Sequence, residues 1–210
     1  MLIITGADQR FKKFVIYLQS QCTKLGYDMK VYDLGGLGFG EQLTVYDDSF
    51  INNGYYNIMN SKSGWCSRGL HKPQMILNTK FDNMLVYMDS DAYPVSRFDE
   101  INTLDFDVGV TVRDGENYGK MSRINAGVIF FKNTVKSHEF MLSWRNRTIE
   151  INNDQIALAE EVATGNYKIL ELPTRIYNYY YFPEPPDENV KIYHFKSAIG
   201  VRNEFDIYAK

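Results

Sequence analysis

The chain has 210 residues, of which 44% are hydrophobic, and a formal charge of −3 at neutral pH. This length fits one compact domain with a core large enough to hold a preorganised site. We therefore expect residues 1–210 to form a single domain. The negative charge and the absence of a dense Lys/Arg run argue against nucleic acid or an anionic membrane as the main partner.

Cysteine content and apolar runs bear on the location of the chain. Only Cys22 and Cys66 are present, far apart and outside any CxxC motif, which indicates neither a disulfide framework nor a zinc site. The first residues have too short an apolar run for a signal peptide, and no stretch approaches the roughly 20 apolar residues that a membrane span needs. We expect a cytoplasmic protein without a transmembrane segment, which could also be one piece of a larger multi-domain protein.

The start of the chain predicts a strand, a helix and a second strand. An apolar run over residues 2–5 leads into a turn at residues 6–8, and apolar residues then recur at helical spacing as far as Cys22. The helix should close at Gly26, and a second strand over residues 29–34 should run into a glycine-rich loop. This is the beginning of a β-α-β unit.

The later elements continue the alternation. Apolar runs predict strands at residues 84–88, 108–112, 126–131, 168–172 and 190–195. Helical spacing predicts helices at residues 72–80, 140–144 and 155–163, the last with Asn153 or Asp154 as its N-cap. We interpret the chain as an α/β fold with a Rossmann-like, mostly parallel mixed sheet flanked by helices. Ligands of such sheets gather beyond the carboxyl ends of the strands.

Two carboxylates, Asp89 and Asp91, stand at the end of the apolar run over residues 84–88. Placing them together is costly unless a cation or hydrogen-bond donors offset their repulsion. Carboxylate oxygens suit Mn²⁺ or Mg²⁺, which usually complete their shell with substrate phosphates. The alternative is a solvated turn, because Asp-x-Asp triplets are common.

Residues 87–94, Tyr-Met-Asp-Ser-Asp-Ala-Tyr-Pro, resemble the D-x-D segment of GT-A fold nucleotide-sugar glycosyltransferases. The likeness is closest in style to retaining family 8 enzymes and related small bacterial or viral transferases. It implies that Asp89, Ser90 and Asp91 contact a divalent cation and the diphosphate of the donor. It also implies a GT-A type fold, a UDP-sugar as the donor and a glycan hydroxyl as the acceptor.

Two early segments also resemble that group, in the same order along the chain. Residues 1–7 resemble its first strand, whose tip meets the nucleotide base and ribose. The resemblance therefore assigns a donor-binding role to Thr5, Gly6 and Ala7. Arg68 and Lys72 resemble its basic helix start near the donor phosphates.

Three later segments complete the resemblance. One resembles the strand that shapes the donor-sugar pocket and begins with Asn125, Ala126 and Gly127. Another resembles the "D-Q" helix start that faces the acceptor and the reacting carbon, and supplies Asp154 and Gln155. The last resembles a late "H-F" segment whose histidine completes the metal shell and whose nearby lysine touches phosphate, and supplies His194 and Lys196.

Each of these roles has a plainer alternative. A lysine or arginine such as Lys72 or Arg68 is often a solvated surface residue, and a lone histidine is often packed in a core. Asp154 can be a helix N-cap, and Gly127 can mark a bulge or tight packing in a strand. The tyrosine-rich stretch at residues 177–181 could line a sugar groove, but structural packing is the favoured interpretation.

The sequence thus predicts an enzyme that transfers a sugar in a metal-dependent reaction. Asp154 would be the general base if the reaction inverts, whereas Asp154 and Gln155 would only position groups if it retains. The alternatives are a sugar-nucleotide pyrophosphorylase and a non-catalytic module that binds nucleotide-sugars or glycans. The first is disfavoured because the turn after the first strand has few glycines, the second because the acidic residues are present.

Overall fold

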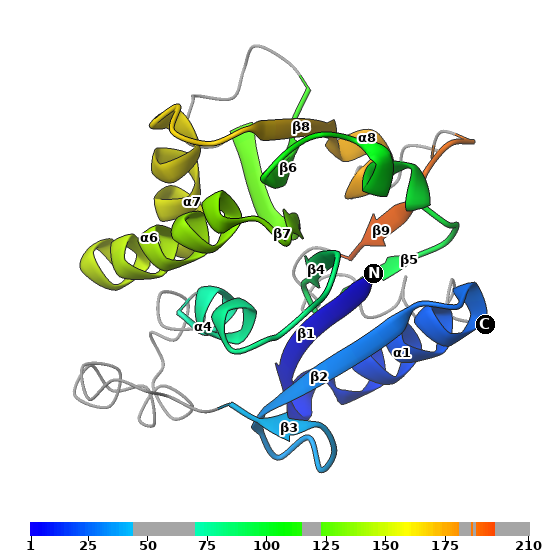
Figure 1. Ribbon diagram of the computed structural model, residues 1–210. Coiled ribbons are helices and arrows are strands. Elements are labelled where there is room, and N and C mark those ends of the chain that lie inside the picture. Colours follow the sequence, from blue (N-terminus) through cyan, green and yellow to red (C-terminus); the bar gives the residue numbers. More distant parts are fainter. Residues whose placement is uncertain (44–69, 115–122, 181–185, 187, 196–210) are drawn as a thin grey trace.

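The computed structural model describes residues 1–43, 70–114, 123–180, 186 and 188–195. Two predicted phosphate-contacting residues, Arg68 and Lys196, lie outside the described residues. Their roles therefore stay predictions. Figure 1 shows a central sheet with helices packed around it.

Among the described residues, seven strands form the main sheet in the order β3-β2-β1-β4-β7-β6-β8 (Figure 1). Their bounds are β1 (Leu2–Asp8), β2 (Asp28–Gly35), β3 (Glu41–Gln42), β4 (Met84–Met88), β6 (Val108–Val112), β7 (Ile124–Lys132) and β8 (Ile169–Pro173). Neighbouring strands pair in parallel, except that β7 runs antiparallel to both β4 and β6. The predicted α/β fold with a mostly parallel mixed sheet is confirmed.

A second, small sheet joins distant parts of the chain. It pairs β5 (Ala92–Pro94) with β9 (Ile192–His194) in an antiparallel arrangement. The helices are α1 (Lys12–Leu25), α4 (His71–Leu77), α6 (Val135–Ile151), α7 (Asp154–Ala163) and α8 (Thr174–Tyr177), with short 3₁₀ segments η1 (Gln9–Phe11) and η3 (Asp99–Thr103). The small sheet brings the end of the described chain beside the segment that follows β4.

Strand β4 lies between two hydrophobic cores and is buried along its whole length. Met84, Val86 and Met88 face the core that contains the apolar side of α1. Leu85 and Tyr87 face the opposite core, which α4, α6 and α7 cover. Successive side chains of a strand point to opposite faces, so a strand covered on both faces is apolar throughout. The prediction of a buried central strand is confirmed.

The ends of two helices follow their sequence signals. Helix α1 ends at Gly26, whose φ of 74° is the left-handed conformation that glycine adopts readily. At the start of α7, the side chain of Asn153 accepts a hydrogen bond from the N–H of Ile156. Asn153 is therefore the N-cap, and Asp154 is the first helical residue, with its carboxylate engaged elsewhere.

Some predicted bounds are wrong. Strand β1 continues through Asp8 and pairs with β2 along its length, so the turn predicted at residues 6–8 does not exist. Helix α4 ends at Leu77 instead of residue 80. There the hydroxyl of Thr79 donates to the carbonyl of Met75, a local bond that competes with helix continuation. At the other end of the chain, β9 has three residues instead of the six predicted.

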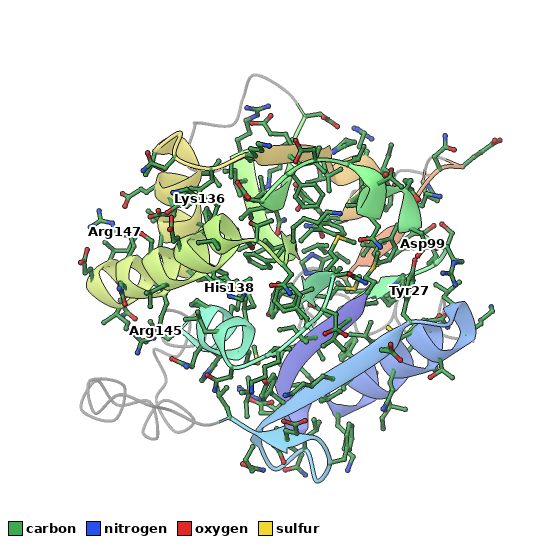
Figure 2. All side chains as sticks on the ribbon, viewed as in Figure 1. Tyr27, Asp99, Lys136, His138, Arg145 and Arg147 are labelled. Atoms are coloured by element: carbon green, nitrogen blue, oxygen red, sulfur yellow. The ribbon has the colours of Figure 1, made fainter. Side chains whose placement is uncertain are left out.

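The outer surface of α6 carries charged side chains, including Lys136 and Arg147 (Figure 2). Arg147 forms ion pairs with Glu150 on the same helix and with Glu160 on α7. The pair with Glu160 connects the two helices. No helix in the part of the chain that the structure describes has the length and apolarity needed to cross a membrane.

Candidate functional site

Three residues that can bind a metal ion meet beyond the carboxyl end of β4. Asp89 and Asp91 lie in the turn between β4 and β5, and His194 is the last residue of β9. The Nε2 atom of His194 lies 3.3 Å from Oδ1 of Asp91 and 3.7 Å from Oδ2 of Asp89. One ligand atom from each residue lies within 4.8 Å of the other two. The structure thus brings together the three predicted metal ligands.

Backbone hydrogen bonds fix the turn that carries the two aspartates. The N–H of Asp89 donates to the carbonyl of Gly127 on β7, at 2.8 Å. The carbonyl of Asp91 accepts from the N–H of Phe195, directly after β9, at 2.9 Å. Ser90 lies between the two aspartates and is partly buried. The aspartates are therefore held by the main sheet on one side and the small sheet on the other.

Lys72 connects the metal-ligand cluster to Asp154. Its Nζ lies 3.0 Å from Oδ1 of Asp89 and 3.1 Å from Oδ2 of Asp154. Burial opposes the charged form of Lys72, but the carboxylates of Asp154 and Asp89 outweigh it and raise the pKa of the lysine. Lys72 is therefore not a solvated surface residue. Asp154 is not the helix cap, because Asn153 caps α7.

Tyr87 contacts the same carboxylate oxygen of Asp89 as Lys72 does. Its hydroxyl donates to Oδ1 of Asp89 at 2.7 Å, and burial together with the charge of Asp89 raises the pKa of the tyrosine well above its usual value. The pKa of Asp89 is lowered, because Lys72 and His194 outweigh the effect of burial. The cluster therefore holds Asp89 as a carboxylate.

Two residues that the sequence did not indicate hold His194 on the side of its ring away from the aspartates. The Nδ1 atom of its ring lies 2.7 Å from Oδ1 of Asn178, whose Nδ2 donates to the hydroxyl of Thr111 at 2.8 Å. All three side chains are buried. No local pattern identifies this group, because its members come from β6, from the end of α8 and from β9.

Gly127 makes room for the ring of His194. A Cβ atom at this position would lie 2.4 Å from Cε1 and 2.8 Å from Nδ1 of the ring, which is closer than real atoms approach. Its N–H donates to Oδ1 of Asn125 at 2.8 Å, and the carbonyl of Ala126 lies 3.4 Å from Nζ of Lys72. Asn125, Ala126 and Gly127 thus lie against the cluster, and tight packing accounts for the glycine.

The other predicted site residues that the structure describes lie on β1 and at the start of α7. Thr5 and Ala7 are buried within β1, and Gly6 lies against Met75 of α4, where an added Cβ would lie 2.3 Å from the sulfur. Gln155 follows Asp154 on α7 and is partly buried. The donor-binding role of the β1 residues stays a prediction.

The tyrosine-rich stretch packs against the core where the structure describes it. Tyr179 is buried and its ring meets that of Tyr193 edge to face. Tyr177 meets Phe130 in the same way and donates a hydrogen bond to Glu100. These contacts support the interpretation of structural packing.

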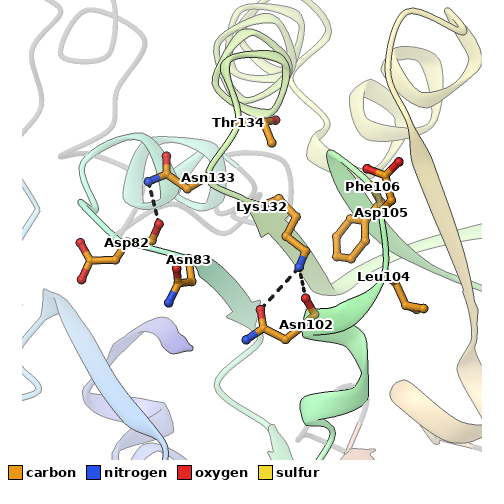
Figure 3. A pocket seen from close by; sticks show the side chains of 9 residues that line it. All are labelled: Asp82, Asn83, Asn102, Leu104, Asp105, Phe106, Lys132, Asn133 and Thr134. Carbon is orange, nitrogen blue, oxygen red and sulfur yellow. Dashed lines mark hydrogen bonds between the residues drawn. The ribbon is translucent and has the colours of Figure 1, made fainter.

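A cavity of about 530 Å³ lies at the opposite edge of the sheet (Figure 3). It is lined by the residues before β4 and β6 and those at the end of β7, including Asn83, Asp105 and Lys132. The ammonium of Lys132 donates to the backbone carbonyl of Asn102. This cavity is separate from the carboxyl edge where the metal-ligand cluster lies.

The side chains of Asp89, Asp91 and His194 are of the types that bind divalent cations. The donor set of two carboxylates and one imidazole nitrogen suits Mn²⁺, and the carboxylates also suit Mg²⁺. The lone pair of an unprotonated Nε2 would face two negative charges, and a cation between them removes that repulsion.

Three solved structures have the same fold as this chain. The galactosyltransferase LgtC, in complex with donor and acceptor sugar analogs, superposes with a TM-score of 0.59 over 93% of this chain and 87% of its own, at 13% identity. A glycosyltransferase involved in glycosylation of the major capsid of PBCV-1 gives 0.55 over 97% and 98%, at 15% identity. The bifunctional glycosyltransferase WbbM gives 0.57 over 93% of this chain and 45% of its own, at 11% identity.

No family model and no curated protein matches the sequence. Identities of 11–15% to the solved structures establish the fold and nothing finer. The chain therefore has a GT-A-like glycosyltransferase fold, as the segment resemblance implied.

Proposed function

We propose that this chain is a metal-dependent glycosyltransferase that moves a sugar from a nucleotide-sugar donor to an acceptor hydroxyl. The observation that carries the proposal is the cluster of Asp89, Asp91 and His194 at the carboxyl edge of a GT-A-like sheet. We take a UDP-sugar as the donor and a glycan as the acceptor because the segments around these residues resemble those of such enzymes. Mn²⁺ is the favoured cation because the donor set includes an imidazole.

Asp89, Asp91 and His194 would hold the cation. When bound, a divalent cation offsets the negative charge that grows on the leaving nucleoside diphosphate as the glycosidic bond breaks. The two phosphate-contacting residues implied by the resemblance, Arg68 and Lys196, would add positive charge from segments outside the described residues.

Asp154 is the residue we propose to face the acceptor. Its carboxylate is tied through Lys72 to Asp89, so its position is fixed relative to the ligand cluster. The backbone of Asp154 is also held, because its carbonyl accepts a hydrogen bond of 2.9 Å from the indole N–H of Trp144 on α6. If the reaction inverts, Asp154 takes the proton of the acceptor hydroxyl, and if it retains, Asp154 and Gln155 orient the substrates.

The test is donor hydrolysis with a panel of nucleotide-sugars, in Mn²⁺, in Mg²⁺ and with a chelator. We expect turnover of a specific donor that needs the metal and falls by about a hundredfold or more in Asp91→Asn. Asp105→Asn is the matched control, because Asp105 is exposed and pairs with Lys168 at the opposite edge of the sheet.

Other outcomes would redirect the proposal. Donor binding without metal dependence would point to a non-catalytic binding module. Formation of a nucleotide-sugar from a nucleoside triphosphate and a sugar phosphate would point to a pyrophosphorylase.

A further inference from the structure

The imidazole of His194 has a different partner on each side. Its Nε2 faces the carboxylates of Asp91 and Asp89, and its Nδ1 faces the side-chain oxygen of Asn178 at 2.7 Å. The side chain is 96% buried, so water does not compete for either nitrogen. Which nitrogen carries the proton is therefore decided by the protein.

Asn178 has its own orientation fixed by Thr111. The threonine hydroxyl lies 3.2 Å from the carbonyl of Asn125 and 3.4 Å from that of Val128, both of which can only accept. Its single proton goes to one of these two carbonyls, so its oxygen accepts from Nδ2 of Asn178 at 2.8 Å. The amide oxygen of Asn178 is then the atom that faces His194.

An amide oxygen carries no proton, so the hydrogen bond between Asn178 and His194 requires a proton on Nδ1 of the ring. In the neutral imidazole the lone pair is then on Nε2, the atom that faces Asp89 and Asp91. A histidine with a lone pair on this nitrogen is ready to bind a metal ion, since the partner of the other nitrogen sets the tautomer.

The ring has no alternative position on the side of β7. Gly127 lies so close that even a methyl group would overlap Cε1. Asn178 is in turn anchored through its backbone N–H, which donates to the carbonyl of Thr174 at 3.1 Å and closes α8. The orientation of His194 is thus fixed from β6, β7 and α8 together.

We infer that Asn178, held by Thr111, is a positioning residue that keeps His194 in the Nδ1–H tautomer and so presents Nε2 as a metal ligand. This inference rests on the proposed function for the role of the metal. The proton on Nδ1 follows from the hydrogen bond with Asn178 and does not depend on a bound metal ion.

The experiment uses ¹⁵N-histidine NMR of the metal-free protein at alkaline pH, with the His194 signals assigned from a His194→Gln variant. We expect the wild type to prefer a proton on Nδ1. Asn178→Leu removes the acceptor and should abolish that preference, whereas Asn178→Asp keeps an acceptor oxygen and should preserve it. The NMR spectra also report whether each variant is folded.

Mn²⁺ binding to the same proteins is the second measurement. We expect roughly a 10- to 100-fold weaker affinity in Asn178→Leu, as for other residues that orient metal-binding histidines, and a much smaller loss in Asn178→Asp. A bare Nδ1 in the wild type would overturn the inference, as would wild-type affinity in a folded Asn178→Leu. If the tautomers behave as expected but the wild type binds neither Mn²⁺ nor Mg²⁺, the proposed function fails instead, and Asn178 only orients a core histidine.

Discussion

Gly127 lies directly beneath the ring of His194, with no space for a side chain between them. An added Cβ would lie 2.4 Å from Cε1 of the ring. The backbone of β7 thereby sets the height of the histidine above the sheet. The position of the His194 ring therefore requires a glycine at residue 127, whether or not a ligand binds to the histidine.

Replacing Gly127 with alanine should displace the imidazole. We expect a loss of about 1–3 kcal/mol in the free energy of unfolding, as for other overpacked sites, and at least a tenfold loss in Mn²⁺ affinity. Isothermal titration calorimetry and urea unfolding measure the two effects. Gly109→Ala is the control, because its Cβ would crowd Phe130 at 3.1 Å without touching the cluster. Equal metal affinity in both variants would contradict the role of Gly127.

Replacing Tyr87 with phenylalanine should loosen Asp89. The variant removes only the hydroxyl that donates to Oδ1 of Asp89 at 2.7 Å, so we expect about a tenfold weaker Mn²⁺ affinity and a small loss of stability. Tyr32→Phe is a matched control, since it removes a buried hydroxyl bonded to Thr79 at the opposite side of β1. If both variants bind Mn²⁺ equally well, Tyr87 does not position Asp89.

Replacing Lys72 with methionine should leave the carboxylates of Asp89 and Asp154 without the ammonium group that both contact. The side chains of Lys72, Asp89 and Asp154 are less than one quarter exposed, so we expect a loss of roughly 3 kcal/mol in unfolding free energy. Lys72→Arg keeps the positive charge and should therefore lose less unfolding free energy than Lys72→Met. Lys30→Met tests the same substitution at a pair with the exposed Glu41, where roughly 1 kcal/mol or less is expected. Similar losses of unfolding free energy at both positions would argue against a stabilising contact of Lys72 with Asp89 and Asp154.

The acid stability of the protein should depend in part on Asp33. Burial opposes its charged form, but hydrogen bonds from the N–H groups of Leu37, Gly35 and Gly38 outweigh burial and lower the pKa of Asp33 below its usual 3.8. A lowered pKa contributes stability that is present above 3.8 and is lost as the pH falls through the folded-state value.

Asp33→Asn should therefore be less stable than the wild type by roughly 1–2 kcal/mol at neutral pH, with the difference shrinking as the pH falls below 3.8. Urea unfolding of both proteins across this range measures the difference. A difference that stays constant with pH would show that the charge of Asp33 contributes nothing.

The sequence predicted those parts of the fold and site that local patterns encode. The strand over residues 84–88 follows from an apolar run, and Asp89 and Asp91 stand out because two carboxylates together are costly without a cation or hydrogen-bond donors. Elements of two to four residues, such as β3, β5 and α8, are too short to show a period and were missed.

Contacts between distant segments could not be predicted in this way. Thr111 and Asn178 are 67 residues apart and meet only because β8 pairs beside β6 and turns directly into α8. Lys72 was predicted near the donor phosphates from its place in a motif, while its pairing with Asp154 depends on how α4 packs beside α6 and α7.

The small sheet of β5 and β9 has a consequence for the order in which the protein is made. Asp89 and Asp91 leave the ribosome about 100 residues before His194, and this separation makes their meeting a slow, long-range step of folding. A nascent chain that ends before β9 holds the two carboxylates without their histidine. A chain that has not yet paired β9 with β5 therefore has only two of the three side chains that we propose to bind the metal ion, and the ligand set is complete only after this pairing.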